Sequence, residues 1–185
     1  MALSRFTALA DRIDRLNAGV GRAASWCALG IVLIAFAVVL MRYVLGVGSI
    51  WLQESILYLH AALFLLAAAW TLKENGHVRV DVFYADASPR TQALVDLFGA
   101  LLLLLPFTVA LLWLALPYVG RSWAILERSR ETSGLPLVFL LKTLIPVFAL
   151  LLALQGVAQA IRALSILIPP PLAGVGGPRS GPGGG

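Results

Sequence analysis

The chain has 185 residues, of which 60% are apolar and only 12% are charged, and its formal net charge is +5. A soluble globular domain is typically about 45–50% apolar and about 25% charged, because its surface needs polar side chains. The composition therefore excludes a soluble enzyme domain, a disordered chain or a nucleic-acid binder as the main interpretation, and it indicates an integral membrane protein. The single cysteine, Cys27, excludes an intramolecular disulfide framework.

Residues 1–22 are the most polar stretch before the first apolar run. Their apolar side chains recur every three or four positions, as on one face of a helix, and these are Leu3, Phe6, Leu9, Ile13, Leu16 and Val20. This pattern predicts a cytoplasmic amphipathic helix that lies in the plane of the membrane interface. The basic leader of a first membrane span would have the same pattern, so the sequence leaves both interpretations open.

Four apolar runs follow, and we expect residues 23–168 to form an all-α membrane domain of four transmembrane helices. About 20 apolar residues in a helix cover the roughly 30 Å of hydrocarbon in a bilayer. Pro106 lies inside the third run and should kink that helix. Residues 169–185 are rich in Gly and Pro and are predicted to be a disordered tail. The predicted spans cover about residues 23–42, 50–72, 94–119 and 135–160.

The distribution of Lys and Arg predicts the orientation of these spans. An even number of spans places both termini on the same side of the membrane. Lys and Arg are more numerous in the two terminal segments and in the connection 73–93 than in the loop 120–134 on the other side. The positive-inside rule therefore predicts that both termini are cytoplasmic.

Three charged residues lie within or at the ends of the predicted spans, at comparable depth: Arg42, Glu54 and Lys142. A charged Asp, Lys or Arg at the centre of a span costs about 2.5–3.5 kcal/mol on insertion scales, so such groups normally face a partner or a cavity. The three residues could form one interhelical network that includes a Glu54–Lys142 pair. The alternative is that Arg42 and Lys142 separately extend to the head groups. His60, deeper in the second span, is expected to make an interhelical hydrogen bond rather than relay protons.

The sequence has no pattern that would support catalysis, a bound cofactor or a metal. Its two histidines, His60 and His77, would lie about 26 Å apart along a single helix, too far to share one haem. Cys27 lies far upstream of both, and no phosphate-binding loop is present. We therefore expect a protein that is not an enzyme and has no cofactor.

Four short motifs follow one another in a fixed order between about residues 20 and 165. They are Arg42-Tyr43 at the end of span one, Trp51 and Glu54 at the start of span two, His77, Arg79 and Asp81 with Ser88-Pro89-Arg90 after span two, and Lys142 with Pro146 in span four. This ordered set resembles the small membrane subunit of tripartite ATP-independent periplasmic (TRAP) transporters, the DctQ-like family.

The resemblance implies a subunit of a secondary, ion-gradient-driven uptake transporter in the bacterial inner membrane, with an organic acid such as a dicarboxylate as substrate. Its partners would be a large multi-span permease subunit, which this chain scaffolds, and a periplasmic solute-binding protein, which it helps to dock. His77, Arg79 and Asp81 would form a cytoplasmic loop motif. The residues of a subunit interface or intramembrane polar network would be Arg42, Trp51, Glu54, His60 and Lys142. A membrane anchor of a cytochrome-type redox complex and a stand-alone four-helix channel are the competing interpretations.

Overall fold

The computed structural model describes residues 2–77, 84 and 86–168, and every regular element in these residues is helical. The elements are α1 (Ala2–Val44), α2 (Ile50–Lys73), α3 (Pro89–Phe98), the π-helix η2 (Gly99–Leu104), α4 (Leu105–Ala124) and α5 (Val138–Leu167). Four helical segments are long and apolar enough to cross a membrane, which confirms the prediction of a four-span all-α membrane protein. The predicted tail, 169–185, lies outside the described residues.

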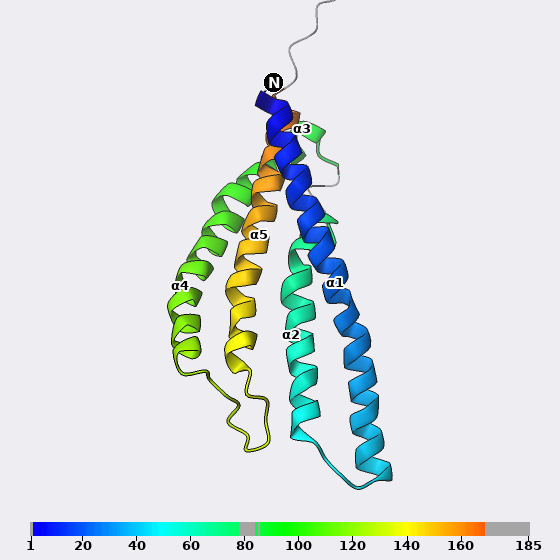
Figure 1. Ribbon diagram of the computed structural model, residues 1–185. Coiled ribbons are helices and arrows are strands. Elements are labelled where there is room, and N and C mark those ends of the chain that lie inside the picture. The colour runs from blue at the N-terminus through cyan, green and yellow to red at the C-terminus, as the bar shows by residue number, and fades with distance from the viewer. Residues whose placement is uncertain (1, 78–83, 85, 169–185) are drawn as a thin grey trace, which may run out of the picture.

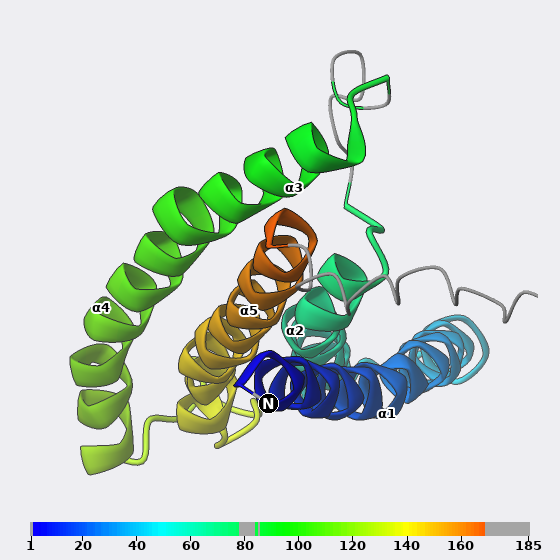
Figure 2. The ribbon, with the colours of Figure 1, turned by 90° about the horizontal axis from the view of Figure 1, so that it is seen from above.

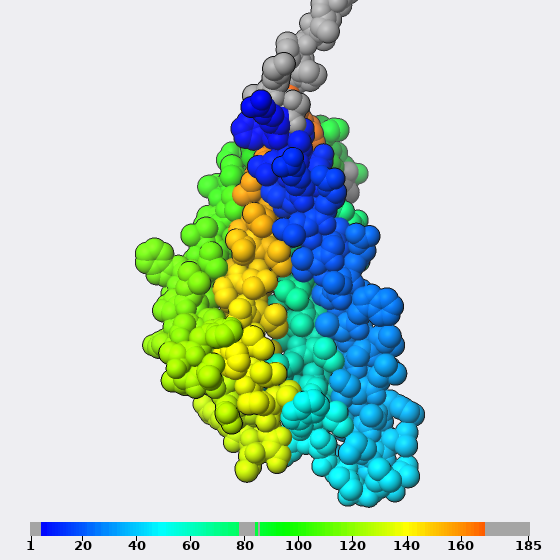
Figure 3. Space-filling view, viewed as in Figure 1, coloured from blue at the N-terminus to red at the C-terminus, as the bar shows by residue number. Residues whose placement is uncertain are grey.

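Helix α5 is the centre of the bundle, because it contacts α1, α2, α3 and α4 (Figures 1 and 2). Helix α1 also packs along α2, whereas α4 contacts only η2 and α5 among the described elements. The four long helices therefore lie in the order α4, α5, α2, α1 across the face seen in Figure 3. Alanines predominate at the closest crossings, as in the cluster of Ala10, Ile13 and Ala158, and small side chains let membrane helices approach closely.

The first helix differs from the predicted arrangement. Residues 2–22 are helical, as expected, but they are the first half of one unbroken helix of 43 residues rather than a separate element. At 1.5 Å per residue α1 is about 65 Å long. This continuity matches the alternative interpretation, in which the segment leads directly into the first span. The predicted apolar stripe is only partly the buried face, since Ile13 is buried against α5 but Phe6, Leu9 and Leu16 are exposed.

The third span is one curved run of α3, η2 and α4 (Figure 2). Pro106, which we expected to kink the span, lies in the first turn of α4 directly after η2. A proline has no N–H for the backbone ladder. The π-helical turn η2 comes just before this proline and changes the register of the backbone hydrogen bonds. In this register the N–H of Leu105 donates to the carbonyl of Ala100, five residues earlier.

Different helix ends and connections lie at the two ends of the bundle. At the amino-terminal end, α1 begins, α2 and α5 end, and α3 begins (Figure 1). At the hairpin end, residues 45–49 join α1 to α2 and residues 125–137 join α4 to α5. The polar side chains that join different elements lie toward these two ends, and His60 lies between them.

Candidate functional site

Two helices meet through polar side chains at the amino-terminal end, in what we call the amino-terminal polar cluster. Asn17 Nδ2 of α1 donates to Gln155 Oε1 of α5 at 2.7 Å, and Gln155 Nε2 donates to Asp14 Oδ1 at 3.0 Å. Arg162 of α5 forms ion pairs with Asp14 and, at 3.2 Å, with Asp11. The bonds form a continuous chain that holds the first half of α1 against α5.

The centre of this cluster is buried, because Gln155 is 0% exposed, Asn17 is 1% exposed and Asp14 is 6% exposed, whereas Asp11 and Arg162 lie at its exposed edge. A buried polar group is costly unless it is hydrogen-bonded, so each member makes the position of the others more specific. Asn17 Oδ1 is the exception, since it is buried without a hydrogen-bond partner in the described chain. The hydrogen bonds between these amide and carboxylate groups fix the position of α1 relative to α5 where the two helices cross.

The sequence did not predict this cluster, and Asp14, Asn17 and Gln155 are not among the site residues expected above. The usable signal was spacing, since Ala10, Ile13, Asp14 and Asn17 recur at steps that share one helical face. Gln155 was a second signal, as an isolated amide within the apolar run of the fourth span.

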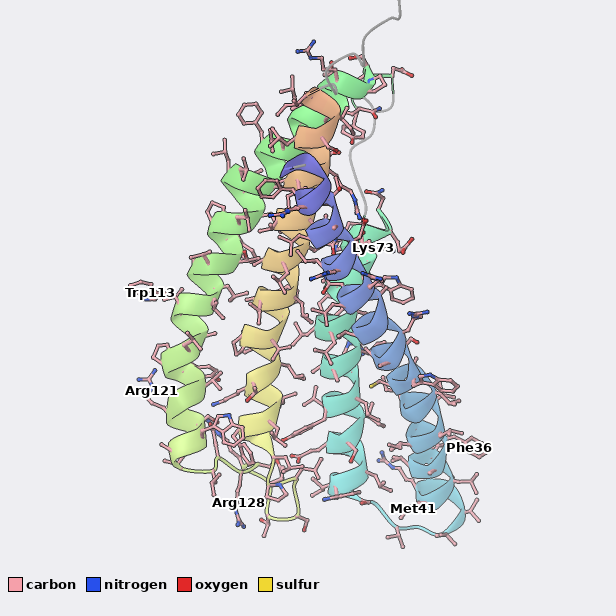
Figure 4. The ribbon with its side chains drawn as sticks, turned by 45° about the horizontal axis from the view of Figure 1, so that its top comes forward. Phe36, Met41, Lys73, Trp113, Arg121 and Arg128 are labelled. Atoms are coloured by element: carbon pink, nitrogen blue, oxygen red, sulfur yellow. The ribbon has the colours of Figure 1, made fainter. Side chains whose placement is uncertain are left out.

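A cavity of about 240 Å³ adjoins the amino-terminal polar cluster, and α3 and α5 supply most of its lining. Tyr84 donates its hydroxyl to Asp96 Oδ2 at 2.8 Å on the α3 side of this cavity. At the edge, Lys73 (labelled in Figure 4) donates to Glu74 Oε1 at 2.6 Å. That hydrogen bond holds the pKa of Glu74 below its ordinary value. Cations and carboxylates therefore already pair with each other around the cavity.

Glu54 of α2 organises the connection between α4 and α5 at the hairpin end. Its carboxylate accepts hydrogen bonds from the Ser129 hydroxyl and, at 2.6 Å, from the Leu135 N–H. The Ser129 N–H in turn donates to the Leu135 carbonyl at 3.2 Å. Because residue 135 belongs to this connection, α5 begins at Val138 rather than at the predicted 135.

Glu127 and Lys142 form the second contact at this end. Lys142 Nζ lies 2.5 Å from Glu127 Oε2 and 4.2 Å from the centroid of the Tyr118 ring. The Ser122 hydroxyl also donates to Glu127 Oε2, at 2.7 Å. The hydrogen bond from Lys142, and then that from Ser122, hold the pKa of Glu127 below its ordinary value of 4.5. The connection 125–137 is thus bonded to α5 through Lys142 as well as to α2 through Glu54.

These contacts correct the predicted network. Within the described residues Glu54 bonds to the 125–137 connection and Lys142 pairs with Glu127, so the expected Glu54–Lys142 pair does not form. Arg42 is exposed at the end of α1 and makes no ion pair in the described part of the chain. Glu54 and Lys142 do lie toward the same end of the bundle, but the sequence did not reveal that the connection 125–137 supplies their partners.

The other expected site residues are dispersed. Trp51 is exposed in the first turn of α2, and His77 is exposed after its end. His60 is exposed in the middle of α2, and over residues 2–77, 84 and 86–168 it makes no hydrogen bond, so the expected interhelical bond is absent there. Arg79 and Asp81 lie outside the described residues. No group of three or more His, Cys, Asp or Glu side chains gathers in the described chain as a metal ion would require.

Comparison with known families identifies the chain. The family model for tripartite ATP-independent periplasmic transporters, DctQ component, matches residues 31–165, which run from the second half of α1 almost to the end of α5. The chain belongs to the DctQ family. It is therefore the small membrane component of a TRAP transporter, as the motifs suggested. Comparison with curated proteins and with solved structures gives no match.

The two clusters relate differently to the family match. The residues of the hairpin-end contacts, Glu54, Glu127 and Lys142, all lie inside the matched region. Of the amino-terminal polar cluster only the α5 members do, because the match begins at residue 31, after Asp14 and Asn17. The hairpin-end contacts thus lie within the region of the chain that the DctQ family model matches, and part of the amino-terminal polar cluster lies outside it.

Proposed function

We propose that this chain supports the large permease subunit of an ion-gradient-driven TRAP uptake transporter and does not itself carry substrate. The observation that carries the proposal is the family match, which covers the second half of α1 and nearly all of the other three spans, and which is described as the DctQ component of tripartite transporters. On this proposal the chain is not an enzyme, and the sites for the driving ion and the solute lie in the large subunit.

The use of the polar side chains within the spans supports a scaffold. A path for solutes or ions needs polar groups along a water-filled route, where they bind the cargo. Here Gln155 and its neighbours join α1 to α5, and Lys142 holds the hairpin connection. These groups already serve the fold, which favours a structural role over transport through this chain alone.

The location and the remaining partners follow from the proposed role. We place the chain in the bacterial inner membrane with both termini in the cytoplasm, as the excess of Lys and Arg near the termini favours. The hairpin end then faces the periplasm, where the connection 125–137, held by Glu54, is available to a solute-binding protein. An organic acid such as a dicarboxylate is the proposed substrate class.

Co-purification tests the proposal. An affinity-tagged chain, expressed in its native background and extracted in mild detergent, should retain a larger multi-span membrane protein. Cells that lack this chain should lose binding-protein-dependent uptake, and reconstitution of both membrane subunits should restore it. A tagged chain that emerges monodisperse without a larger partner, or that transports solute alone in liposomes, would contradict the proposal.

A further inference from the structure

One face of α2 is unpartnered, and we call it the His60 face. Gln53, Leu57, His60 and Phe64 are all exposed, and their spacing of four, three and four residues places them on a single side of the helix. Leu57 is 56% exposed and Phe64 is 69% exposed. After the first turn of α2, every other residue up to Lys73 is buried or half-buried against the chain's own helices.

His60 makes this face unsuited to lipid. It lies about 15 Å along α2 from Ile50, at the rise of 1.5 Å per residue, and therefore near mid-membrane depth. Hydrocarbon offers nothing to a ring N–H or to the other ring nitrogen, and an unsatisfied polar group there is costly. Since the described chain supplies no hydrogen bond to His60, the partner must come from outside these residues.

The outer face of α4 is the useful contrast. Phe107 is 57% exposed and Leu114, seven residues further along the helix, is 69% exposed, and both side chains are entirely apolar. Such a surface is satisfied by acyl chains without any protein. Exposure alone therefore does not distinguish the two faces; the imidazole at mid-span does.

We propose that a membrane-spanning helix of the large subunit covers the His60 face and presents a hydrogen-bonding group, such as a carboxylate, hydroxyl or amide, to the imidazole. A hollow of about 420 Å³ continues this face toward the hairpin end, where Gln53, Leu57 and Glu131 are among its lining residues, and it can receive a side chain of that helix. The inference rests on the proposed function, because a DctQ chain is one component of a multi-component transporter and lipid cannot supply the hydrogen bond.

The first test measures how much large subunit a tagged chain retains. His60→Leu keeps the apolar face but removes the hydrogen bond, and we expect about a threefold loss of affinity, the average for one hydrogen bond between membrane helices. His60→Gln, which still donates and accepts, should retain more than His60→Leu. The control Phe107→Leu, on the purely apolar outer face of α4, should bind like the wild type. Because His60 makes no hydrogen bond in the described chain, His60→Leu should leave the thermal midpoint of the isolated chain unchanged.

A photoreactive residue in place of Phe64 identifies what covers the face. Cross-linking to the large subunit is the expected result. If the large subunit co-purifies but residue 64 cross-links only to lipid or to a second copy of this chain, the inference is wrong and the proposed function stands. If no large subunit co-purifies with the wild type, both fail. A destabilised His60→Leu chain would also overturn the inference, since it would show that His60 serves the fold.

Discussion

Two glycines of α1, two residues apart, offer a sharp test of how α1 and α2 pack. A Cβ added at Gly21 would lie 2.6 Å from both Cβ and Cε3 of Trp70, whereas a Cβ added at Gly19 would meet nothing within 4 Å. Carbon atoms in contact normally lie about 3.5–4.0 Å apart. Because the Cβ of Trp70 is attached to the α2 backbone, rotation of the ring cannot relieve the contact, and the helices must separate.

The expected magnitudes have opposite signs. Overpacking a close contact costs about 1–3 kcal/mol. Replacing a helical glycine by alanine gains about 1 kcal/mol in helix propensity. Gly21→Ala therefore gains helix propensity but loses stability through overpacking, whereas Gly19→Ala only gains helix propensity. The free energies of unfolding of the two variants should therefore differ by the overpacking term, about 1–3 kcal/mol.

Thermal unfolding of the purified chain in detergent micelles measures this difference. Gly19→Ala should unfold at or above the wild-type midpoint, and Gly21→Ala should unfold below the midpoint of Gly19→Ala. The two alanine variants share their composition, helix and distance from the chain end, so the comparison isolates the contact with Trp70. Equal midpoints would refute the close approach of α1 to α2 at this position.

Two further predictions concern the polar contacts. Gln155→Leu keeps the volume but removes two buried hydrogen bonds, at an average of roughly 0.6 kcal/mol each between membrane helices; it should lower the thermal midpoint more than Gln159→Leu does on the same helix. The pKa of Glu127 is lowered in the folded chain by Lys142, so the stability that this carboxylate contributes is present above its ordinary value of 4.5 and is lost as the pH falls toward its lowered pKa. Glu127→Gln should thus be less stable than the wild type at neutral pH and equal to it in strong acid, and a constant difference across this range would contradict the assignment.

The four spans were predictable because each needs only about 20 apolar residues in a row, which is a local property of the sequence. The partners of the charged residues were not. Glu54 and Lys142 have opposite charge and similar depth, so a pair between them was reasonable. Their actual partners, Ser129 and Glu127, belong to a connection whose path depends on tertiary contacts. A polar loop gives no periodicity from which its fold could be inferred.

The first half of α1 shows a second limit. In a soluble helix the apolar stripe marks the face that packs against protein. In a membrane protein lipid can cover an apolar face equally well, so Phe6 and Leu16 do not distinguish lipid from a neighbouring helix. Polar residues such as Asn17 do, because only protein or water can satisfy them. In such chains the polar positions are the better guide to helix packing.

The same reasoning divides the polar residues of this chain into two groups with different expected roles. Glu54, Lys142 and Gln155 form hydrogen bonds or an ion pair with other parts of the described chain, so these interactions stabilise the fold of the subunit itself. His60 lies at a similar or greater depth and makes no hydrogen bond in the described chain. Its imidazole can therefore form a hydrogen bond with another subunit without losing one within the described chain. For a subunit proposed to support another, an exposed polar residue that its own described fold leaves unsatisfied is therefore informative. In the proposed assembly α2 carries a contact with the large subunit, while the polar contacts at the two ends of the bundle fix the position of α1 relative to α5 and of α2 and α5 relative to the 125–137 connection.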